Sequence, residues 1–218
     1  MKCRLIFEQS TRDSTFLEII QSAVNDVVEE VNDTSLPEHS VEVRVAIDCE
    51  NVIPETGSGG WTETPNKIWV YFDDTSKNFL KNPNERIRSA VAHEFGHAFR
   101  ELEVPFPGTL LDDLVAEGLA DHLDLALVGG EGKPWSHAVD RNGFVSLFSR
   151  AKVLFNERDY DYFGWFMGSE ELKLPKWGGY SLGFDIVEKY LNKTNFSVVD
   201  AIHLESEKFI EDYSPTSN

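Results

Sequence analysis

The chain has 218 residues, of which 41% are hydrophobic and 27% charged, as in a globular protein that can bury one good core. Its formal net charge of −18 excludes a general affinity for nucleic acid, because the phosphates would be repelled. Its two cysteines, Cys3 and Cys49, do not make a disulfide framework, and we expect both to be reduced. No apolar run approaches the ~20 residues of a membrane span, and the first residues lack the apolar core of a secretion signal. The sequence therefore predicts a cytoplasmic protein without nucleic-acid or membrane partners.

The first hundred residues carry the patterns of alternating strands and helices. The predicted elements are a strand at 3–8, an amphipathic helix at 15–31, strands at 41–47 and 67–72, and a helix at about 84–101. Before the third strand, Pro54 and the glycines Gly57, Gly59 and Gly60 predict a flexible connection.

The helix at about 84–101 contains an H-E-x-x-H motif, from His93 to His97. Histidines four residues apart lie on one face of an α-helix, so both imidazoles can bind one metal ion. Glu94 comes round to the same site and can take a proton from a metal-bound water. The motif alone also fits an amphipathic helix with two incidental histidines.

A second helix, predicted at about 109–127, supplies the remaining groups of a metal site. Glu117 follows His97 by twenty residues, and Asp121 shares its helical face. A hydrolytic zinc site usually has three protein ligands and keeps a fourth position for water. We therefore expect one Zn²⁺, with Glu117 as the third ligand. His122 is the alternative ligand, but it points about 100° away from that face.

The rest of the chain is predicted to be mainly helical. A loop at 104–108 precedes the second ligand helix. The later segments are a helix at 136–156, an irregular stretch rich in aromatic residues and glycine at 158–180, a helix at 182–191 and a last helix at 197–211. Ser181 is the predicted N-cap of the helix at 182–191, with Asp185 in its first turn.

The two motifs together resemble the gluzincin signature, H-E-x-x-H followed by E-x-x-x-D. The metzincin pattern fails, because Glu103 stands where its third histidine would fall and Arg100 stands in place of its glycine. With the segments Gly164–Gly168 and Pro175–Gly183, the motifs also resemble a bacterial family of predicted zinc-dependent proteases, otherwise a domain of unknown function. Some of its members are described as modulators of a small heat-shock protein. The resemblance covers roughly residues 57 to 192.

This resemblance implies a gluzincin-like fold and peptidase activity. In the thermolysin-like pattern Asp121 accepts the spare N–H of the first histidine, here His93, and fixes its tautomer. In zinc peptidases the strand before the active helix commonly forms the sheet edge above the cleft, where an extended peptide can add to it. The segment 67–72, with the glycine loop before it, is our candidate for this edge, and an ordinary core strand with a surface loop is the alternative.

Two further residues are candidates for roles in the site. Tyr180 is a candidate catalytic donor to the oxyanion of a tetrahedral intermediate. Alternatively, its ring packs against Trp165 or Trp177. Arg100 is a weaker candidate for anchoring a substrate carboxylate, and as an exposed helix residue it would instead pair with a neighbouring glutamate.

We predict an α+β, zincin-like fold in a single domain of residues 1–218. An N-terminal lobe, 1–101, combines a mixed sheet with helices and ends in the H-E-x-x-H helix, and a helical lobe, 102–218, carries the third ligand. The predicted function is a zinc metallopeptidase that acts on a peptide or protein, with Glu94 as the general base of a zinc-bound water. The alternatives are a zinc-stabilised regulatory or binding module and hydrolysis of a small amide. The sequence does not indicate an oligomeric state.

Overall fold

A computed structural model describes residues 1–8, 14–104 and 108–215 of the chain. Residues 105–107 of the predicted loop at 104–108 lie outside the described residues. The chain divides into two compact units. The first, here called the sheet unit, comprises Met1–Leu102 and Leu123–Gly130, and the second, the helical unit, comprises Glu103–His122 and Glu131–Asn218.

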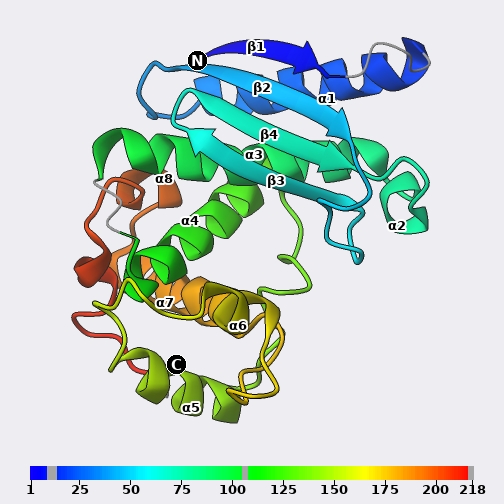
Figure 1. Cartoon of the computed structure of the whole chain (residues 1–218). Coiled ribbons are helices and arrows are strands. Elements are labelled where there is room, and N and C mark those ends of the chain that lie inside the picture. Colours follow the sequence, from blue (N-terminus) through cyan, green and yellow to red (C-terminus); the bar gives the residue numbers. More distant parts are fainter. Residues whose placement is uncertain (9–13, 105–107, 216–218) are drawn as a thin grey trace. The chain divides into compact units, whose positions relative to one another are not determined.

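The sheet unit is built on one four-stranded mixed sheet (Figure 1). Its strands are β1 (Lys2–Phe7), β2 (Ser40–Ile47), β3 (Ser58–Thr64) and β4 (Lys67–Phe72), and its helices are α1 (Ser14–Asn32), α2 (Lys77–Leu80) and α3 (Pro83–Glu103). The strand order is β1-β2-β4-β3. The first three strands in this order are parallel, and β3 pairs with β4 in the antiparallel direction. The predicted α+β class is confirmed.

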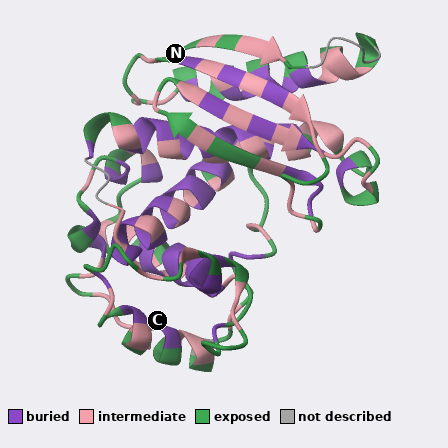
Figure 2. Cartoon of the chain, in the orientation of Figure 1, coloured by how far each residue is buried: buried purple, intermediate pink, exposed green. Residues whose placement is uncertain are grey.

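The helices of this unit cover one face of the sheet. Figure 2 shows the buried and partly exposed residues alternating along β2 and β4, as expected for a sheet with one covered face. Phe79 of α2 is fully buried between Phe72 of β4 and Phe16 of α1, with ring centroids 5.3 Å and 6.0 Å away. Burial of each such side chain contributes about 1.5–3 kcal/mol. This face therefore holds the core of the unit.

The structure decides one alternative left open by the sequence and corrects one prediction. The strand at 67–72, β4, lies inside the sheet and not at its edge, as the core-strand alternative expected, but the glycine segment before it is a strand and not a surface loop. The edge is β3, part of which was predicted to be a flexible connection because of its glycines. A Cβ on Gly59 would lie 2.3 Å from the backbone oxygen of Asn51. The glycine is therefore required for a close approach, and the segment pairs with β4 as a strand, with a register shift between Thr62 and Thr64.

The helical unit is centred on α4 (Leu110–Val128), whose last residues, from Leu123, belong to the sheet unit. The other elements of the unit are α5 (Arg141–Ala151), α6 (Tyr162–Met167), α7 (Gly178–Thr194), α8 (Val198–Ala201) and the 3₁₀ helix η1 (Ser206–Phe209). Leucines on several sides of α4 are fully buried, as expected for a central helix. In place of the long helices predicted at 136–156 and 197–211, the structure has α5 and the short pair α8 and η1.

The prediction for the start of α7 was also wrong. The helix begins at Gly178, four residues earlier than predicted, and Trp177 is its N-cap in a left-handed conformation with φ of 62°. Ser181 lies inside the helix, where its hydroxyl donates to the backbone oxygen of Trp135 at 2.6 Å. The stretch at 158–180 was predicted to be irregular, but it contains α6 and the first turn of α7. Glycines that usually break helices are used here for close packing.

Candidate metal centre

Helix α3 brings the two histidines of the H-E-x-x-H motif together. Both imidazoles are partly exposed, while the neighbouring Val91, Ala92 and Phe95 are buried. The Nε2 atoms of His93 and His97 are 3.2 Å apart. Two nitrogens that bind one tetrahedral zinc ion at about 2.05 Å would be roughly 3.3 Å apart. The separation of the two nitrogens therefore fits two ligands of one zinc ion.

The Glu94 side chain lies against two residues of β3, Gly60 and Thr62. The side chain is 5% exposed. The Thr62 hydroxyl donates to Glu94 Oε2 at 2.8 Å and is 3.1 Å from the backbone oxygen of the same residue. A Cβ on Gly60 would lie 2.5 Å from Glu94 Oε1. The sequence prediction placed Glu94 at the site but missed both of these neighbours.

Negative charge gathers around the histidine pair within the sheet unit. Burial raises the pKa of the Glu101 carboxyl, the charge of His97 lowers it, and the charge of Glu94 raises it further. The pKa of Tyr71 is raised by burial and by the charges of Asp48 and Glu94. An excess of carboxylates beside two imidazoles favours the binding of a cation.

Arg100, predicted to be an exposed helix residue, is only 2% exposed. It lies on α3 two turns after His93, and its side chain is among the largest that are fully buried. Arginine is rarely buried without ionic or hydrogen-bonding partners. The exposed position expected from the sequence was wrong, because α3 buries three successive residues here, Ala98, Phe99 and Arg100, and becomes exposed only at Leu102.

In the helical unit, Glu117 contacts a chain of phenols. Tyr162 Oη donates to Glu117 Oε1 at 3.4 Å, a long hydrogen bond, and Tyr180 donates in turn to Tyr162. Burial is the main cause of the raised pKa values of Tyr162 and Tyr180, and the Glu117 charge raises both further. Both phenols are therefore neutral hydrogen-bond donors at neutral pH.

The Tyr180 ring is packed against Phe166 and Trp135, with ring centroids 5.0 Å and 5.9 Å away. It is buried, as the packing alternative expected, although these are not the aromatic partners predicted from the sequence. Its hydroxyl donates to Tyr162, which in turn donates to Glu117. Tyr162 was not among the residues predicted from the sequence. Tyr162 lies 34 residues after Val128, the last residue of α4, and no spacing rule links it to Glu117.

Asp121 and His122 are adjacent on α4 but have different surroundings. Asp121 is buried, and its carboxylate accepts from Trp135 Nε1 at 3.2 Å and from Ser136 Oγ at 3.0 Å. His122 stacks on Phe184 with ring centroids 4.2 Å apart, and its Nε2 is 3.1 Å from the Phe184 backbone oxygen. Burial lowers the pKa of His122. His122 therefore has a packing role in the helical unit.

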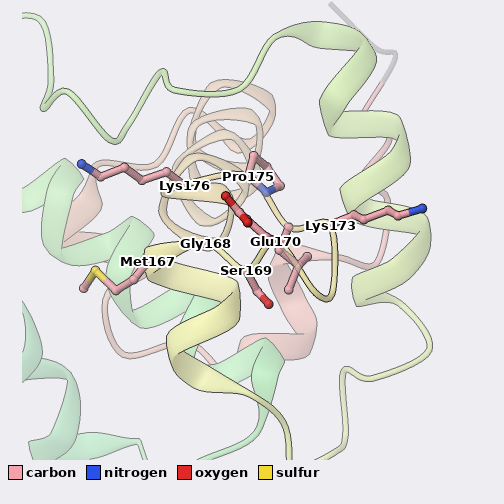
Figure 3. Close-up of a pocket in the computed structure, with 8 residues that line it drawn as sticks. Met167, Gly168, Ser169, Glu170, Lys173, Pro175 and Lys176 are labelled. Atoms are coloured by element: carbon pink, nitrogen blue, oxygen red, sulfur yellow. The ribbon is translucent and has the colours of Figure 1, made fainter.

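A separate hollow lies in the helical unit where α6 ends. It has a volume of about 520 Å³ and is lined by residues from Met167 to Lys176. Figure 3 shows the Lys173 and Lys176 side chains extending away from it in opposite directions, and the Lys176 ammonium lies over the Trp177 ring at 4.0 Å. The hollow is formed by the turn at Gly168, where φ is 96°, and the short bridge between Ser169 and Leu174. It contains none of the predicted site residues.

Comparison with known proteins identifies the family of the chain. Residues 16–211 match the family described as Predicted Zn-dependent protease (DUF2268). The chain belongs to this family. It is 22% identical to the uncharacterised protein YjfC of Bacillus subtilis (strain 168) over 218 residues, which covers 93% of the chain and 71% of YjfC. It is 26% identical to the uncharacterised protein YjaZ of the same organism, over 68% of the chain and 60% of YjaZ.

No solved structure matches the chain. The family description indicates zinc dependence and a protease in general terms, in agreement with the resemblance noted from the sequence motifs. Within the described part of the chain, none of the helices combines the length and apolar character needed to cross a bilayer.

Proposed function

We propose that the protein is a zinc-dependent peptidase in which His93, His97 and Glu117 hold one Zn²⁺. The observation that carries the proposal is the histidine pair, whose Nε2 atoms have the separation of two ligands of one zinc ion. The adjacent Glu94 carboxylate is held in place by β3. A purely structural zinc site needs no such base and usually fills all four positions with protein ligands.

The assignment of Glu117 as the third ligand is supported by the course of α4. Two imidazoles and one carboxylate are the donor set of thermolysin-like zinc sites. In the sheet unit, Ser89 of α3 donates to Asp124 near the end of α4 at 3.0 Å, and both side chains are buried. Ser89 precedes His93 by four residues, and Glu117 precedes Asp124 by seven, so each pair shares one helical face.

In this proposal each side chain has a defined task. When bound, zinc supplies a Lewis acid that polarises the scissile carbonyl and makes water a stronger acid. Glu94 accepts the proton of the attacking water at its carboxylate and returns it to the leaving amine nitrogen. Asp121 is proposed to fix the tautomer of His93, and its contacts with Trp135 and Ser136 restrict its rotation.

We propose that Tyr180, which the sequence offers as a donor to the oxyanion, acts indirectly, because its one phenolic proton is donated to Tyr162. Both phenols are neutral donors, and their hydrogen bonds run from Tyr180 to Tyr162 and on to Glu117. Tyr162 is the one that contacts the proposed ligand. Because Tyr180 is buried among aromatic rings, its part in the reaction is expected to be exerted through Tyr162.

The proposed substrate is an extended peptide segment. Strand β3 is the last strand of its sheet and presents one row of backbone groups that the sheet does not pair. Trp61, in the middle of β3, is 58% exposed. A peptide that adds to β3 would form main-chain hydrogen bonds there and lie beside the strand that holds Glu94.

Cleavage of a peptide library provides the test. Zinc-loaded wild-type protein and Glu94→Gln are each incubated with proteome-derived peptides, and new termini are read by mass spectrometry. We expect cuts from the wild type, and a fall of more than about a hundredfold in Glu94→Gln, which retains its zinc. His97→Ala is expected to lose the metal. Wild-type protein that carries zinc and cuts nothing would contradict the peptidase proposal and favour a binding or regulatory role.

A further inference from the structure

Two residues of β3 face the same helix from the sheet edge. In the register of the antiparallel pair, Thr62 lies opposite Ile68 and Gly60 lies opposite Val70. Ile68 and Val70 are fully buried on the face that the helices cover, and paired residues of neighbouring strands share a face. Thr62 and Gly60 therefore point toward α3, where the Glu94 carboxylate lies against both.

The Thr62 hydroxyl contacts two atoms of one residue. It is 2.8 Å from Glu94 Oε2 and 3.1 Å from the Glu94 backbone oxygen. A hydroxyl has one proton to donate, and the charged oxygen is both the nearer and the stronger acceptor. A rotation of the Glu94 side chain away from β3 would break this bond. The contact therefore selects one conformation of the carboxylate.

Gly60 provides the space in which this conformation fits. A Cβ at position 60 would lie 2.5 Å from Glu94 Oε1 and 2.6 Å from Cγ, closer than non-bonded atoms approach. The backbone angle of Gly60 is not in the left-handed region, so an L-residue there would not strain the backbone but would displace the Glu94 side chain from this conformation. Gly59 differs, since its Cβ would meet the backbone of Asn51. The two glycines thus have separate tasks.

We propose that Thr62 is a positioning residue that holds the Glu94 carboxylate in its reactive conformation, with Gly60 leaving the room for it. This inference rests on the proposed function, because it takes Glu94 as the general base. It adds that the strand offered to the substrate also orients the base. Displacement of β3 would therefore disturb catalysis as well as binding.

The kinetic test compares Thr62→Val, Thr62→Ser and the control Thr64→Val, which changes an exposed threonine of the same strand. With a peptide that the wild type cleaves, Thr62→Val is expected to lower kcat about ten- to a hundredfold, the range for a hydrogen bond to a charged group. Its KM and zinc content should stay within about twofold of the wild type. Thr62→Ser, which keeps the hydroxyl, should recover most of kcat, and Thr64→Val should match the wild type. A Thr62→Val enzyme with wild-type kcat, or a Thr62→Ser enzyme as slow as Thr62→Val, would overturn the role.

A second measurement needs no activity. Urea unfolding of the metal-free wild type, Thr62→Val, Glu94→Ala and the double variant forms a double-mutant cycle. If the hydroxyl holds the carboxylate, the shift in the urea midpoint of the double variant will be smaller than the sum of the single shifts, and additive shifts would overturn the contact. The two proposals fail separately. A wild type that cleaves no peptide refutes the peptidase, whereas a wild type that cleaves no faster than Thr62→Val refutes only the role of Thr62.

Discussion

Two carboxylates, one in each unit, are held in place in different ways. Glu94 in the sheet unit accepts a hydrogen bond from Thr62 at 2.8 Å, and the missing Cβ of Gly60 leaves room for its carboxylate. Glu117 in the helical unit depends on how its helix packs, since its neighbour Gly118 lies against the backbone of Gly183 on α7. Its hydrogen bond from a phenol is long, at 3.4 Å.

Glycine has a different role beside each of the two carboxylates. At position 60 the missing Cβ leaves room for a side chain, while at positions 118 and 183 it lets two helix backbones touch. A Cβ on Gly118 would be 2.3 Å from the Gly183 oxygen, and one on Gly183 would be 2.1 Å from the Leu114 oxygen. We therefore expect changes near Glu94 to reduce the rate of catalysis and changes near Glu117 to reduce stability or metal affinity.

The largest expected effect in the helical unit is that of Gly183→Ala. The new methyl group would collide with the backbone of α4, which cannot rotate away as a side chain can, so the helices must separate. Overpacking of this kind costs about 1–3 kcal/mol in the free energy of unfolding. Urea denaturation measures it, with Gly178→Ala as the control, since a Cβ there would meet side chains at 3.2 Å or more. Equal stability of the two variants would show that the α4–α7 contact does not need the glycine.

A smaller effect is expected from Tyr162→Phe, which removes the hydrogen bond to Glu117. Loss of a group that supports a metal ligand typically lowers metal affinity by ten- to a hundredfold, and the long distance here favours the low end, about tenfold. A competition titration with a zinc chelator gives the Kd. Tyr160→Phe is the matched control, because Tyr160 donates to Asp113 on the same helix. If both variants bind zinc equally tightly, the phenol does not support Glu117 as a ligand.

The smallest effect concerns pH and His122. Burial lowers the pKa of His122 below its ordinary value of 6.5, so the unfolded chain takes up a proton at a higher pH than the folded chain. The stability that neutral His122 contributes is therefore complete above about pH 6.5 and decreases as the pH falls below it. The decrease is at most about 1.4 kcal/mol per pH unit.

His122→Gln lacks this titration, while the other histidines still titrate in it. Urea midpoints of the wild type and the variant at pH 7.5 and pH 5.5 give the comparison. We expect the wild type to lose more stability than the variant on acidification. If both proteins lose the same stability, His122 takes up a proton as readily in the folded chain as in the unfolded chain.

The histidine pair and the alternating strands could be predicted because the signals are local. Helical spacing fixes His93 and His97 relative to each other, and their observed separation agrees with it. Local sequence patterns likewise predicted the strands β2 and β4. The fold class follows from such periodic segments, and it was confirmed.

The errors arose where the meaning of a residue depends on a distant partner. Gly60 looks like part of a flexible connection until Glu94 is placed against it. Ser181 has the chemistry of an N-cap, but a backbone oxygen from Trp135, 46 residues away, accepts its proton. Tyr162 belongs to this group too, since its tie to Glu117 is visible only in three dimensions.

The exposed indole of Trp61 gives the protein an optical reporter at its sheet edge. Among the five tryptophans of the chain, Trp135 and Trp165 are buried and Trp61 is 58% exposed. A segment that lay along β3 would shield this indole from water, shift its emission to shorter wavelength and protect it from a soluble quencher. Ligand association could thus be followed by intrinsic fluorescence, without a label and without turnover.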